Sequence, residues 1–598
     1  MAGSFFSRPL VSLAAALDRR FGWDRLPLPL GLLVLAGLRT ELREENLYDT
    51  GLPDPPEDLL AKARDPRFLR SRTTDGTLND LGNPLMGSLG VRFGRNFRLD
   101  RTWPEDPPAV LEPSPRTVSN ELLVRKEFIP ATTLNVLAAA WIQFEVHDWF
   151  SHGKNERDKP WELGLAEDDP WPERPMRIPR TRPDPSYDPA SGFPPTFVTA
   201  DSHWWDASQI YGSDPELSKR LRAGEGGKLR VDENGLLPKD LEQGVDLAGV
   251  AGNFWIGLGV LHTLFTLEHN AICDRLQAEY PAWSDDELHD HARLVNAALM
   301  AKIHTVEWTP AIIAHPTTRY AMRANWWGIL GEGFRRRFGR LGSGEILSGI
   351  PGSPTDHHGV PYSLTEEFVG VYRMHPLLPD EFTFRSVSDD ALLEERTFRE
   401  VGALDTRKRL EEMGVASAVY SLGIAHPGAI VLHNYPRFLQ YFEKADGTIL
   451  DLAATDVLRV RERGVPRYND FRRLLRLRPA ESFEELTDDP KLAEEIRSVY
   501  GGQIERVDLL VGLYAEPRPE GFGFSDTAFR IFILMASRRL KSDRFFTRDY
   551  TPELYSQTGL DWIDENSMVT VLRRHYPELE PALQGVENAF TPWRRVGG

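Results

Sequence analysis

Two histidine segments about two hundred residues apart place the strongest constraint on how this chain folds. The first is Gln143-Phe-Glu-Val-His147, with an amide one helical turn before the histidine, and the second is Tyr372-Arg-Met-His375. One neutral imidazole can bind a haem iron, and a second, with its neighbouring amide, can act on oxygen or peroxide bound on the opposite face. The pair therefore predicts a haem held between two distant segments of one fold.

The tyrosine of the second segment is placed to take part in the chemistry. Tyr372 stands three residues before His375, so on a helix the two side chains share a face. The phenol would then lie beside the ligated macrocycle, where an oxidised haem can convert it into a radical. Pro376 follows the histidine and is expected to end this helix.

Length and composition are those of a large globular protein. The 598 residues include 41% hydrophobic and 27% charged residues, close to the usual averages. No linker-like change in composition and no repeat interrupts the chain, which predicts one catalytic domain over residues 71–598 behind an N-terminal helical arm over residues 1–70. The net charge of -18 argues against nucleic acid as a partner, because binding phosphates needs a basic face.

The single cysteine excludes an internal disulfide framework. Cys273 lies in an apolar-periodic stretch without a glycine-rich loop around it. A thiolate ligand to haem iron is the alternative, but free cysteines are most often buried in cores. We therefore interpret Cys273 as a core thiol, which fits a reducing compartment.

The N-terminal arm contains two short apolar runs. Residues 9–17 have the look of a weak signal-peptide core, but acidic and basic residues follow at once, so we expect no export and a cytoplasmic location. Residues 26–38 are too short to span a bilayer. We expect two amphipathic helices that either pack on the body, which we favour, or rest on a membrane surface near a lipid entrance.

Helical periodicity dominates the rest of the sequence and predicts a mainly α fold with little β-structure. Residues 132–150 are expected to form a helix that Thr132 or Thr133 caps. Residues 284–308 open with the sequence of a capping box. Residues 525–541 repeat the helical pattern before a pair of arginines.

Five segments carry a family resemblance that extends from about residue 40 to the end of the chain. They are Thr73-Thr-Asp-Gly-Thr-Leu-Asn-Asp, residues 142–150, Trp204-Trp-Asp-Ala-Ser-Gln-Ile-Tyr-Gly212, residues 361–379 and residues 461–468. With these segments in the same order, the chain resembles the fatty-acid alpha-dioxygenases of the peroxidase-cyclooxygenase superfamily. The resemblance implies a large, single-domain, mainly helical haem peroxidase/cyclooxygenase-like fold.

The resemblance also implies roles for the two histidine segments. His147 is the implied distal histidine, and Gln143 lies beside it to hydrogen-bond a bound peroxide and move its proton. His375 is the implied axial ligand of haem, and Tyr372 is the implied radical residue. A proximal imidazole usually donates its other nitrogen to an acceptor. Asn434 is our candidate acceptor, with an unrelated structural asparagine as the alternative.

Three residues match the family positions that hold the substrate carboxylate: His304, Thr309 and Arg539. An aliphatic acid in an apolar channel needs its charge compensated, and arginine offers a bidentate fork. A head group held near Tyr372 would bring the C2 hydrogen, rather than a mid-chain one, to the phenoxyl. Without the resemblance, Arg539 would be interpreted as a surface residue of a basic cluster.

A calcium site is implied as well, because oxygen donors recur on alternate residues of one loop and a carboxylate directly follows the distal histidine. A hard cation prefers six or more oxygens from carboxylate, hydroxyl and carbonyl groups. The serine at 202 stands where related proteins often have threonine, which keeps the hydroxyl. The implied ligands are Asp148, Ser202, Trp204, Asp206 and Ser208.

A missing motif separates the chain from the mammalian-type peroxidases of the superfamily, which have a distal arginine and glutamate or methionine links to haem. Aligned on the shared Glu268-His-Asn270, residues 251–256 contain none of these three residue types. We therefore expect non-covalent haem b and a low peroxidase turnover, because a cationic donor that favours oxygen–oxygen cleavage is missing.

The expected reaction is dioxygenation of a long-chain fatty acid. Hydrogen peroxide or a hydroperoxide activates the enzyme, the radical of Tyr372 abstracts a C2 hydrogen, and O2 adds to give a 2-hydroperoxy fatty acid. Loss of carbon dioxide can then leave a chain-shortened aldehyde. Two alternatives stay open: a haem peroxidase acting on small phenols or halides, and a non-catalytic haem- or lipid-binding protein.

Overall fold

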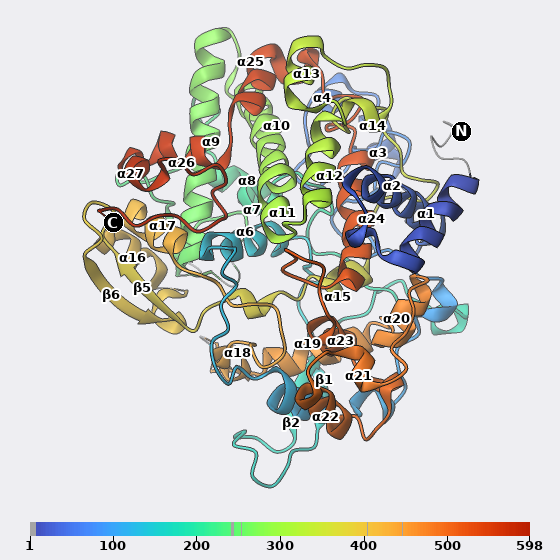
Figure 1. The fold of residues 1–598 in the computed structure, drawn as a ribbon. Coiled ribbons are helices and arrows are strands. Elements are labelled where there is room, and N and C mark those ends of the chain that lie inside the picture. The colour runs from blue at the N-terminus through green and yellow to red at the C-terminus, as the bar shows by residue number, and fades with distance from the viewer. Residues whose placement is uncertain are drawn as a thin grey trace.

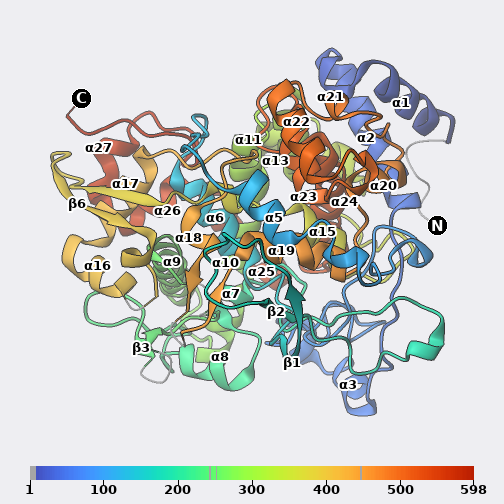
Figure 2. The same cartoon turned by 90° about the horizontal axis from the view of Figure 1, so that it is seen from below.

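The computed structural model describes residues 8–240, 244–250, 252, 254–403, 405–444 and 447–597. Most of this part is helical, and the helices gather around a long central pair, α9 (Ile256–Glu279) and α10 (Asp285–Ile303), as Figure 1 shows. Seen from below in Figure 2, α6 (Val136–Val146) lies between α9 and the helices that surround α24 (Asp526–Ser542). The predicted mainly α fold with little β-structure is confirmed.

The remaining helices of ten or more residues in the described part frame this centre. They are α1 (Arg8–Phe21), α2 (Leu28–Glu45), α12 (Pro316–Trp327), α17 (Val415–Ile424), α19 (Leu452–Glu462), α22 (Pro490–Val499) and α25 (Pro552–Glu565). The shorter helices are α3 (Glu57–Lys62), α4 (Pro66–Arg70), α5 (Pro115–Val118), α7 (Ser208–Tyr211), α8 (Pro215–Leu221), α11 (Thr309–Ile312), α13 (Gly331–Phe338), α14 (Glu345–Ser348), α15 (Glu366–Val371), α16 (Asp405–Met413), α18 (Arg437–Gln440), α20 (Tyr468–Leu474), α21 (Phe483–Leu486), α23 (Leu509–Ala515), α26 (Met568–His575) and α27 (Glu580–Leu583).

The strands of the described part form four separate antiparallel ribbons of two strands each. Two of them, β1–β2 and β5–β6, lie at the edge of the molecule in Figure 1. The strands are β1 (Glu156–Leu163), β2 (Met176–Arg180), β3 (Lys239–Asp240), β4 (Val245–Asp246), β5 (Glu381–Arg385), β6 (Leu392–Thr397), β7 (Phe442–Glu443) and β8 (Ile449–Leu450).

The central helices begin where their caps predict. The Ser284 hydroxyl accepts the backbone N–H of Glu287, and the Glu287 carboxylate accepts that of Ser284, so the expected capping box starts α10. α6 and α9 have apolar residues around most of their circumference, as helices buried on all sides do. Cys273 on α9 is buried, and burial raises the pKa of its thiol to about 12, which agrees with a core thiol.

Two helix boundaries differ from the sequence prediction. α6 begins at Val136, and its cap is Asn135, which accepts the backbone N–H of Ala138, rather than Thr132 or Thr133. The predicted helix over residues 284–308 is α10 as far as Ile303, after which a π-helical turn, His304–Trp308, widens the backbone. Such turns are frequent at functional sites.

The prediction that Tyr372 and His375 share one helix is wrong. α15 ends at Val371, Tyr372 caps it, and a separate 3-10 turn runs over His375–Leu377. Pro376 has no N–H and disfavours helical backbone before it, so the helix ends earlier than periodicity suggests. The turn, rather than helical spacing, sets how the phenol and the imidazole lie.

The N-terminal arm packs on the body of the protein. The indole of Trp23, between α1 and α2, is buried and donates to Asp526 Oδ1 at 2.8 Å. Arg530 pairs with Asp18 at 2.8 Å. Both contacts join the arm to α24. Among the described residues, none of the helices combines the length and apolar character that crossing a membrane needs.

Candidate active site

The distal segment is held in place at the end of α6. His147 caps this helix, and its backbone N–H donates to the carbonyl of Gln143 at 3.0 Å. The Gln143 side chain is oriented by Trp255, whose Nε1 donates to Oε1 at 2.8 Å. Both ring nitrogens of His147 are buried. Within the described part of the chain, neither forms a hydrogen bond of normal length and angle. Burial lowers the pKa of His147 to about 4, so this imidazole is neutral and able to accept a proton.

The proximal segment meets a buried aspartate. His375 Nδ1 lies 2.8 Å from Oδ2 of Asp456 on α19, and Arg373 and the Tyr435 hydroxyl contact the same carboxylate at 3.3 and 2.9 Å. Although burial acts to raise it, the charges of His375 and Arg373 hold the pKa of Asp456 below its usual value. With Nδ1 facing this carboxylate, Nε2 is the nitrogen left to bind a metal.

The prediction that Asn434 accepts a hydrogen bond from His375 is wrong. The Asn434 Oδ1 accepts from Arg125 Nε at 3.0 Å and from the backbone N–H of Ile129 at 3.1 Å. Its Nδ2 donates to the carbonyls of Ile129 and Ala429. Both ends of the amide are used to join loops, so Asn434 has the structural role that was the alternative.

Tyr372 is surrounded by aromatic rings. Its ring centroid lies 4.4 Å from that of Phe368, 5.8 Å from that of Phe150 and 6.2 Å from that of Phe532 on α24. Burial raises the pKa of Tyr372 far above its usual value, while the charge of Arg539 opposes this. The phenol therefore keeps its proton in the physiological range.

The two histidine segments come together in space. Phe150, three residues after His147, contacts Tyr372, three residues before His375. Trp255 makes a second connection near the distal segment. Its indole N–H donates to Gln143, and its ring centroid lies 5.6 Å from that of Phe382 on β5. Residues 251–256 contain no arginine, glutamate or methionine. Two of them, residues 251 and 253, lie outside the described residues.

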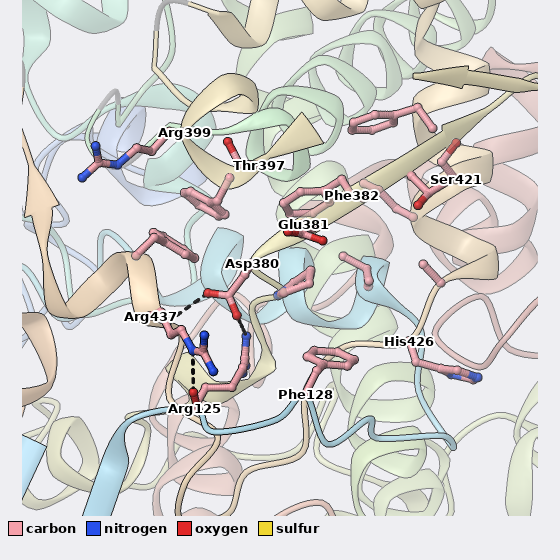
Figure 3. A pocket seen from close by; sticks show the side chains of 18 of the residues that line it. Arg125, Phe128, Asp380, Glu381, Phe382, Thr397, Arg399, Ser421, His426 and Arg437 are labelled. Carbon is pink, nitrogen blue, oxygen red and sulfur yellow. Dashed lines mark hydrogen bonds and ion pairs between the residues drawn. The ribbon is translucent and has the colours of Figure 1, made fainter. Parts of the chain in front are cut away.

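A cleft of about 700 Å³ opens to solvent beside this site (Figure 3). Phe382 and Phe398 line it, and their rings also pack on Trp255. At its lower side Asp380 joins Arg125 and Arg437, as the dashed lines in Figure 3 mark. The described residues that line this cleft include none of the predicted site residues.

The predicted carboxylate-binding residues are buried in the core. The guanidinium carbon of Arg539 lies over the Trp149 ring, 3.1 Å from its centroid, and Nη2 donates to the carbonyl of Trp204 at 3.4 Å. Its Nε and Nη1 form no hydrogen bond within the described part of the chain. Arg539 is 1% exposed, so the alternative of a surface arginine is wrong, and a buried cation of this kind suits an anion.

His304 and Thr309 flank the π-helical turn. The Trp141 indole donates to His304 Nδ1 at 3.2 Å, so a neutral His304 has its proton on Nε2 and can donate from there. Burial, aided by the charge of Arg539, lowers the pKa of His304 to about 3, which keeps the ring neutral. Thr309 is buried at the start of α11.

The predicted calcium ligands lie close together. Ser208 Oγ donates to Asp148 Oδ2 at 2.6 Å, and the backbone N–H of Ser208 donates to Asp206 Oδ1 at 3.2 Å. Ser202 Oγ accepts the backbone N–H of Trp204 at 3.1 Å. The described residues contain no group of three or more His, Cys, Asp or Glu side chains placed to hold a metal. The candidate set is two carboxylates with hydroxyl and carbonyl oxygens.

Several residues of the site were missed in the sequence. Asp456 lies 81 positions beyond His375, on α19. No motif near it in the sequence indicates that it contacts His375. Trp141 and Trp149 recur at a spacing of eight around the distal histidine. On a continuous helix that spacing would place both on one side, which was a usable signal.

Comparisons with known proteins agree with this geometry. The model of the animal haem peroxidase family matches residues 71–590. The chain is 40% identical to alpha-dioxygenase PIOX of Oryza sativa subsp. japonica, over 99% of this chain and 96% of that protein. A crystal structure of Oryza sativa fatty acid alpha-dioxygenase with palmitic acid has a TM-score of 0.89 and 38% identity, covering 99% of this chain and 98% of that one. The Arabidopsis thaliana enzyme has a TM-score of 0.90 at 36% identity, covering 98% and 92%.

Two imidazoles on distant segments of one helical fold, brought together through the contact of Phe150 with the buried Tyr372, define a haem enzyme of the animal haem peroxidase family. Within that family the chain belongs to the alpha-dioxygenases. The resemblance and the peroxidase/cyclooxygenase-like fold expected from the sequence are thereby confirmed. Haem is the cofactor of the family. His375, whose Nδ1 faces Asp456, and the buried, neutral His147 are suited to its two faces.

Proposed function

We propose that this protein adds O2 to C2 of long-chain fatty acids and releases 2-hydroperoxy acids. The observation that carries the proposal is that Tyr372 follows the helix before the proximal histidine and is buried close enough to Arg539 for that charge to act on the pKa of the phenol. Tyr372 contacts Phe532, and Arg539 follows two turns later on the same helix, α24. A phenol that borders both the haem side and a carboxylate-binding site can connect the oxidant to the carbon next to the head group.

His375 would hold the haem through Nε2, with Asp456 fixing the ring at Nδ1. When bound, haem supplies the oxidising power that removes one electron and one proton from Tyr372 after activation by a peroxide. Neutral His147 accepts the proton of the peroxide, and Gln143, held by Trp255, orients it. We infer that haem b is bound non-covalently, because residues 251–256 provide no glutamate or methionine for a link.

The substrate steps follow from the carboxylate pocket. Arg539 and the Nε2–H of His304 bind the carboxylate, with Thr309 beside them, which places C2 at the phenoxyl of Tyr372. Tyr372 takes one hydrogen atom from C2, O2 adds to the carbon radical, and the resulting peroxyl takes the hydrogen back from Tyr372. One O2 and one fatty acid thus give one 2-hydroperoxy acid, and the tyrosyl is restored for the next turnover.

The test of the reaction is O2 consumption by the haem-containing protein with palmitate, with guaiacol and without substrate. We expect uptake with palmitate, formation of the 2-hydroperoxy acid or its one-carbon-shorter aldehyde, and slow guaiacol oxidation. Fast guaiacol oxidation without palmitate-dependent uptake would contradict the proposal and favour a peroxidase of small phenols. A haem spectrum with neither activity would favour a binding protein.

We propose that calcium binds between α6 and the loop before α7. Asp206 Oδ2 is buried, with no hydrogen bond in the described part of the chain and only Arg293 Nη2 near it, at 3.6 Å. Burial, with the nearby charges of Asp201 and Asp206, raises the pKa of Asp148 to about 8. A divalent cation would satisfy these oxygens. Trp204, which would contribute its carbonyl, is anchored by its indole N–H to the carbonyls of Gly76 and Met86.

Removal of calcium is expected to lower the stability of the protein. A ligand at a hundred times its Kd stabilises the folded state by about 2.7 kcal/mol, so a chelator should lower the melting temperature and added CaCl2 should restore it. The measurement is thermal unfolding followed by circular dichroism, with MgCl2 as the control for ionic strength. Equal melting temperatures with and without the chelator would reject the site.

We propose that the arm formed by α1 and α2 contacts a membrane surface, which would make the protein peripheral to a membrane. Six large apolar side chains of the two helices are 38 to 51% exposed, and arginines stand beside them. The exposed residues are Leu10, Leu13, Phe21, Leu28, Leu30 and Leu33.

Vesicle flotation tests this contact. We expect the protein to float with vesicles of phosphatidylcholine and phosphatidylserine, and the double variant Leu13→Asp, Phe21→Asp to stay in the dense fraction, because burying a charged side chain in the interface is unfavourable. Leu392→Asp, at an exposed leucine on β6, is the matched control and should float. Equal flotation of all three proteins would place the contact elsewhere.

A further inference from the structure

Glu145 is a buried acid on the distal helix that the proposed reaction leaves unused. α6 presents Gln143 and His147 on one face, while Trp141, Glu145 and Trp149 recur every fourth residue along another, the last just beyond the end of the helix. Glu145 is 0% exposed. A carboxyl group in such a place needs a partner or a function.

This second face of the distal helix leads to the carboxylate pocket. Trp141 donates its indole N–H to His304, and the ring of Trp149 lies under Arg539. Between them, Glu145 Oε2 accepts the indole N–H of Trp205 at 2.9 Å. The helix that carries the distal histidine therefore also supports the residues proposed to bind the fatty acid.

Trp205 connects Glu145 to both carboxylate-binding side chains. Its ring meets that of His304 edge-on, at 5.1 Å and 79°, and its centroid lies 4.9 Å from the Arg539 guanidinium carbon. A buried indole N–H needs an acceptor, and Glu145 is that acceptor. Without it, the ring would have to turn to find another, and the two side chains that pack on it would move.

We propose that Glu145 is a positioning residue for substrate recognition, whose carboxyl fixes the Trp205 ring and through it His304 and Arg539. The inference rests on the proposed roles of these two residues in binding the carboxylate. Burial raises the pKa of Glu145 to about 8, which favours the neutral acid. A carboxyl in either form keeps an acceptor oxygen for the indole.

Two substitutions at Glu145 distinguish the effect of losing the hydrogen bond to Trp205 from the effect of changing the side chain. Glu145→Leu removes the acceptor, whereas Glu145→Gln keeps one and resembles the neutral acid. For Glu145→Leu we expect the KM for palmitate, and its Kd measured in a Tyr372→Phe background, to rise about tenfold, with kcat within about twofold. Glu145→Gln should restore both constants. A normal Kd in the leucine variant, or an equal loss in both variants, would overturn the proposal.

A second variant keeps the test open if Glu145→Leu does not fold. Trp205→Phe removes the indole N–H from the other side, so it should raise the Kd to a similar extent, and the two substitutions together should add little. An unchanged Kd in Trp205→Phe would overturn the proposal. A control is Glu462→Leu, because Glu462 accepts the indole N–H of Trp161 at 2.9 Å, and also contacts Thr181 and Arg459, away from this pocket. It should leave the Kd unchanged.

Arg539→Gln in the same binding assay separates two claims: that Arg539 binds the carboxylate, and that Glu145 positions the residues that bind it. Unchanged palmitate binding there would reject the carboxylate pocket itself. Weak binding in Arg539→Gln together with normal binding in Glu145→Leu would reject only the positioning role.

Discussion

Replacing Tyr372 by phenylalanine is expected to abolish palmitate-dependent O2 uptake while haem binding is kept. The phenol is the group proposed to exchange a hydrogen atom with C2, and phenylalanine has no hydrogen of comparable reactivity. The packing changes little, because Tyr372 is surrounded by the rings of Phe368, Phe150 and Phe532. We expect a rate at least about three orders of magnitude below that of the unchanged protein, since loss of a covalent or radical participant is of that size.

The measurements are an oxygen electrode trace, the Soret absorption and the palmitate Kd. Tyr555→Phe is the matched control, because Tyr555 is also fully buried and its hydroxyl donates to one backbone carbonyl, that of Phe545. It should keep full O2 uptake. Substantial fatty-acid-dependent uptake by Tyr372→Phe would reject the radical assignment, while leaving the family and the fold as they are.

Replacing Arg539 by glutamine is expected to weaken palmitate binding by two to three orders of magnitude. Loss of one partner from a buried charge pair costs about 2 to 5 kcal/mol, and each 1.4 kcal/mol is a tenfold change in Kd. Arg539 is a buried cation whose charge acts on the pKa of both Tyr372 and His304. Lysine should restore the affinity only in part, because it lacks the planar fork that stacks on Trp149.

The control for this prediction lies one residue away. Arg538 is also buried, but its Nη2 donates to the carbonyls of Val360 and Pro361, so Arg538→Gln should lower the melting temperature and leave the palmitate Kd unchanged. A comparison of palmitate with the corresponding fatty alcohol adds a second readout. Arg539→Gln should lose its preference for the acid, whereas equal preference in the two proteins would show that the carboxylate binds elsewhere.

The haem-binding elements could be predicted from the sequence because their signals are local. Gln143 and His147 are one turn apart, and the capping box of Ser284 and Glu287 is contained in four residues. The order of the family segments along the chain also predicted the overall fold. The helix over Tyr372 and His375 was predicted wrongly, since helical periodicity outweighed the effect of the following proline.

The partners of these residues could not be predicted in the same way. Asp456 reaches His375, Trp205 reaches Glu145, and Asn434 is used by Arg125 rather than by the proximal histidine. Each of these pairs joins elements far apart in the chain. Which of many carboxylates or amides meets a given ring depends on how whole helices pack, and no spacing along the sequence encodes that.

The amino-acid sequence alone determined the family, the helical class and the residues that can carry the chemistry, since those follow from residue type and short spacing. Only the tertiary structure decided their surroundings. It places a carboxylate at His375, buries Arg539, and brings a second face of the distal helix against His304. The physical reason is that pKa, orientation and anion binding depend on burial and on neighbours from distant segments, which exist only once the chain has packed.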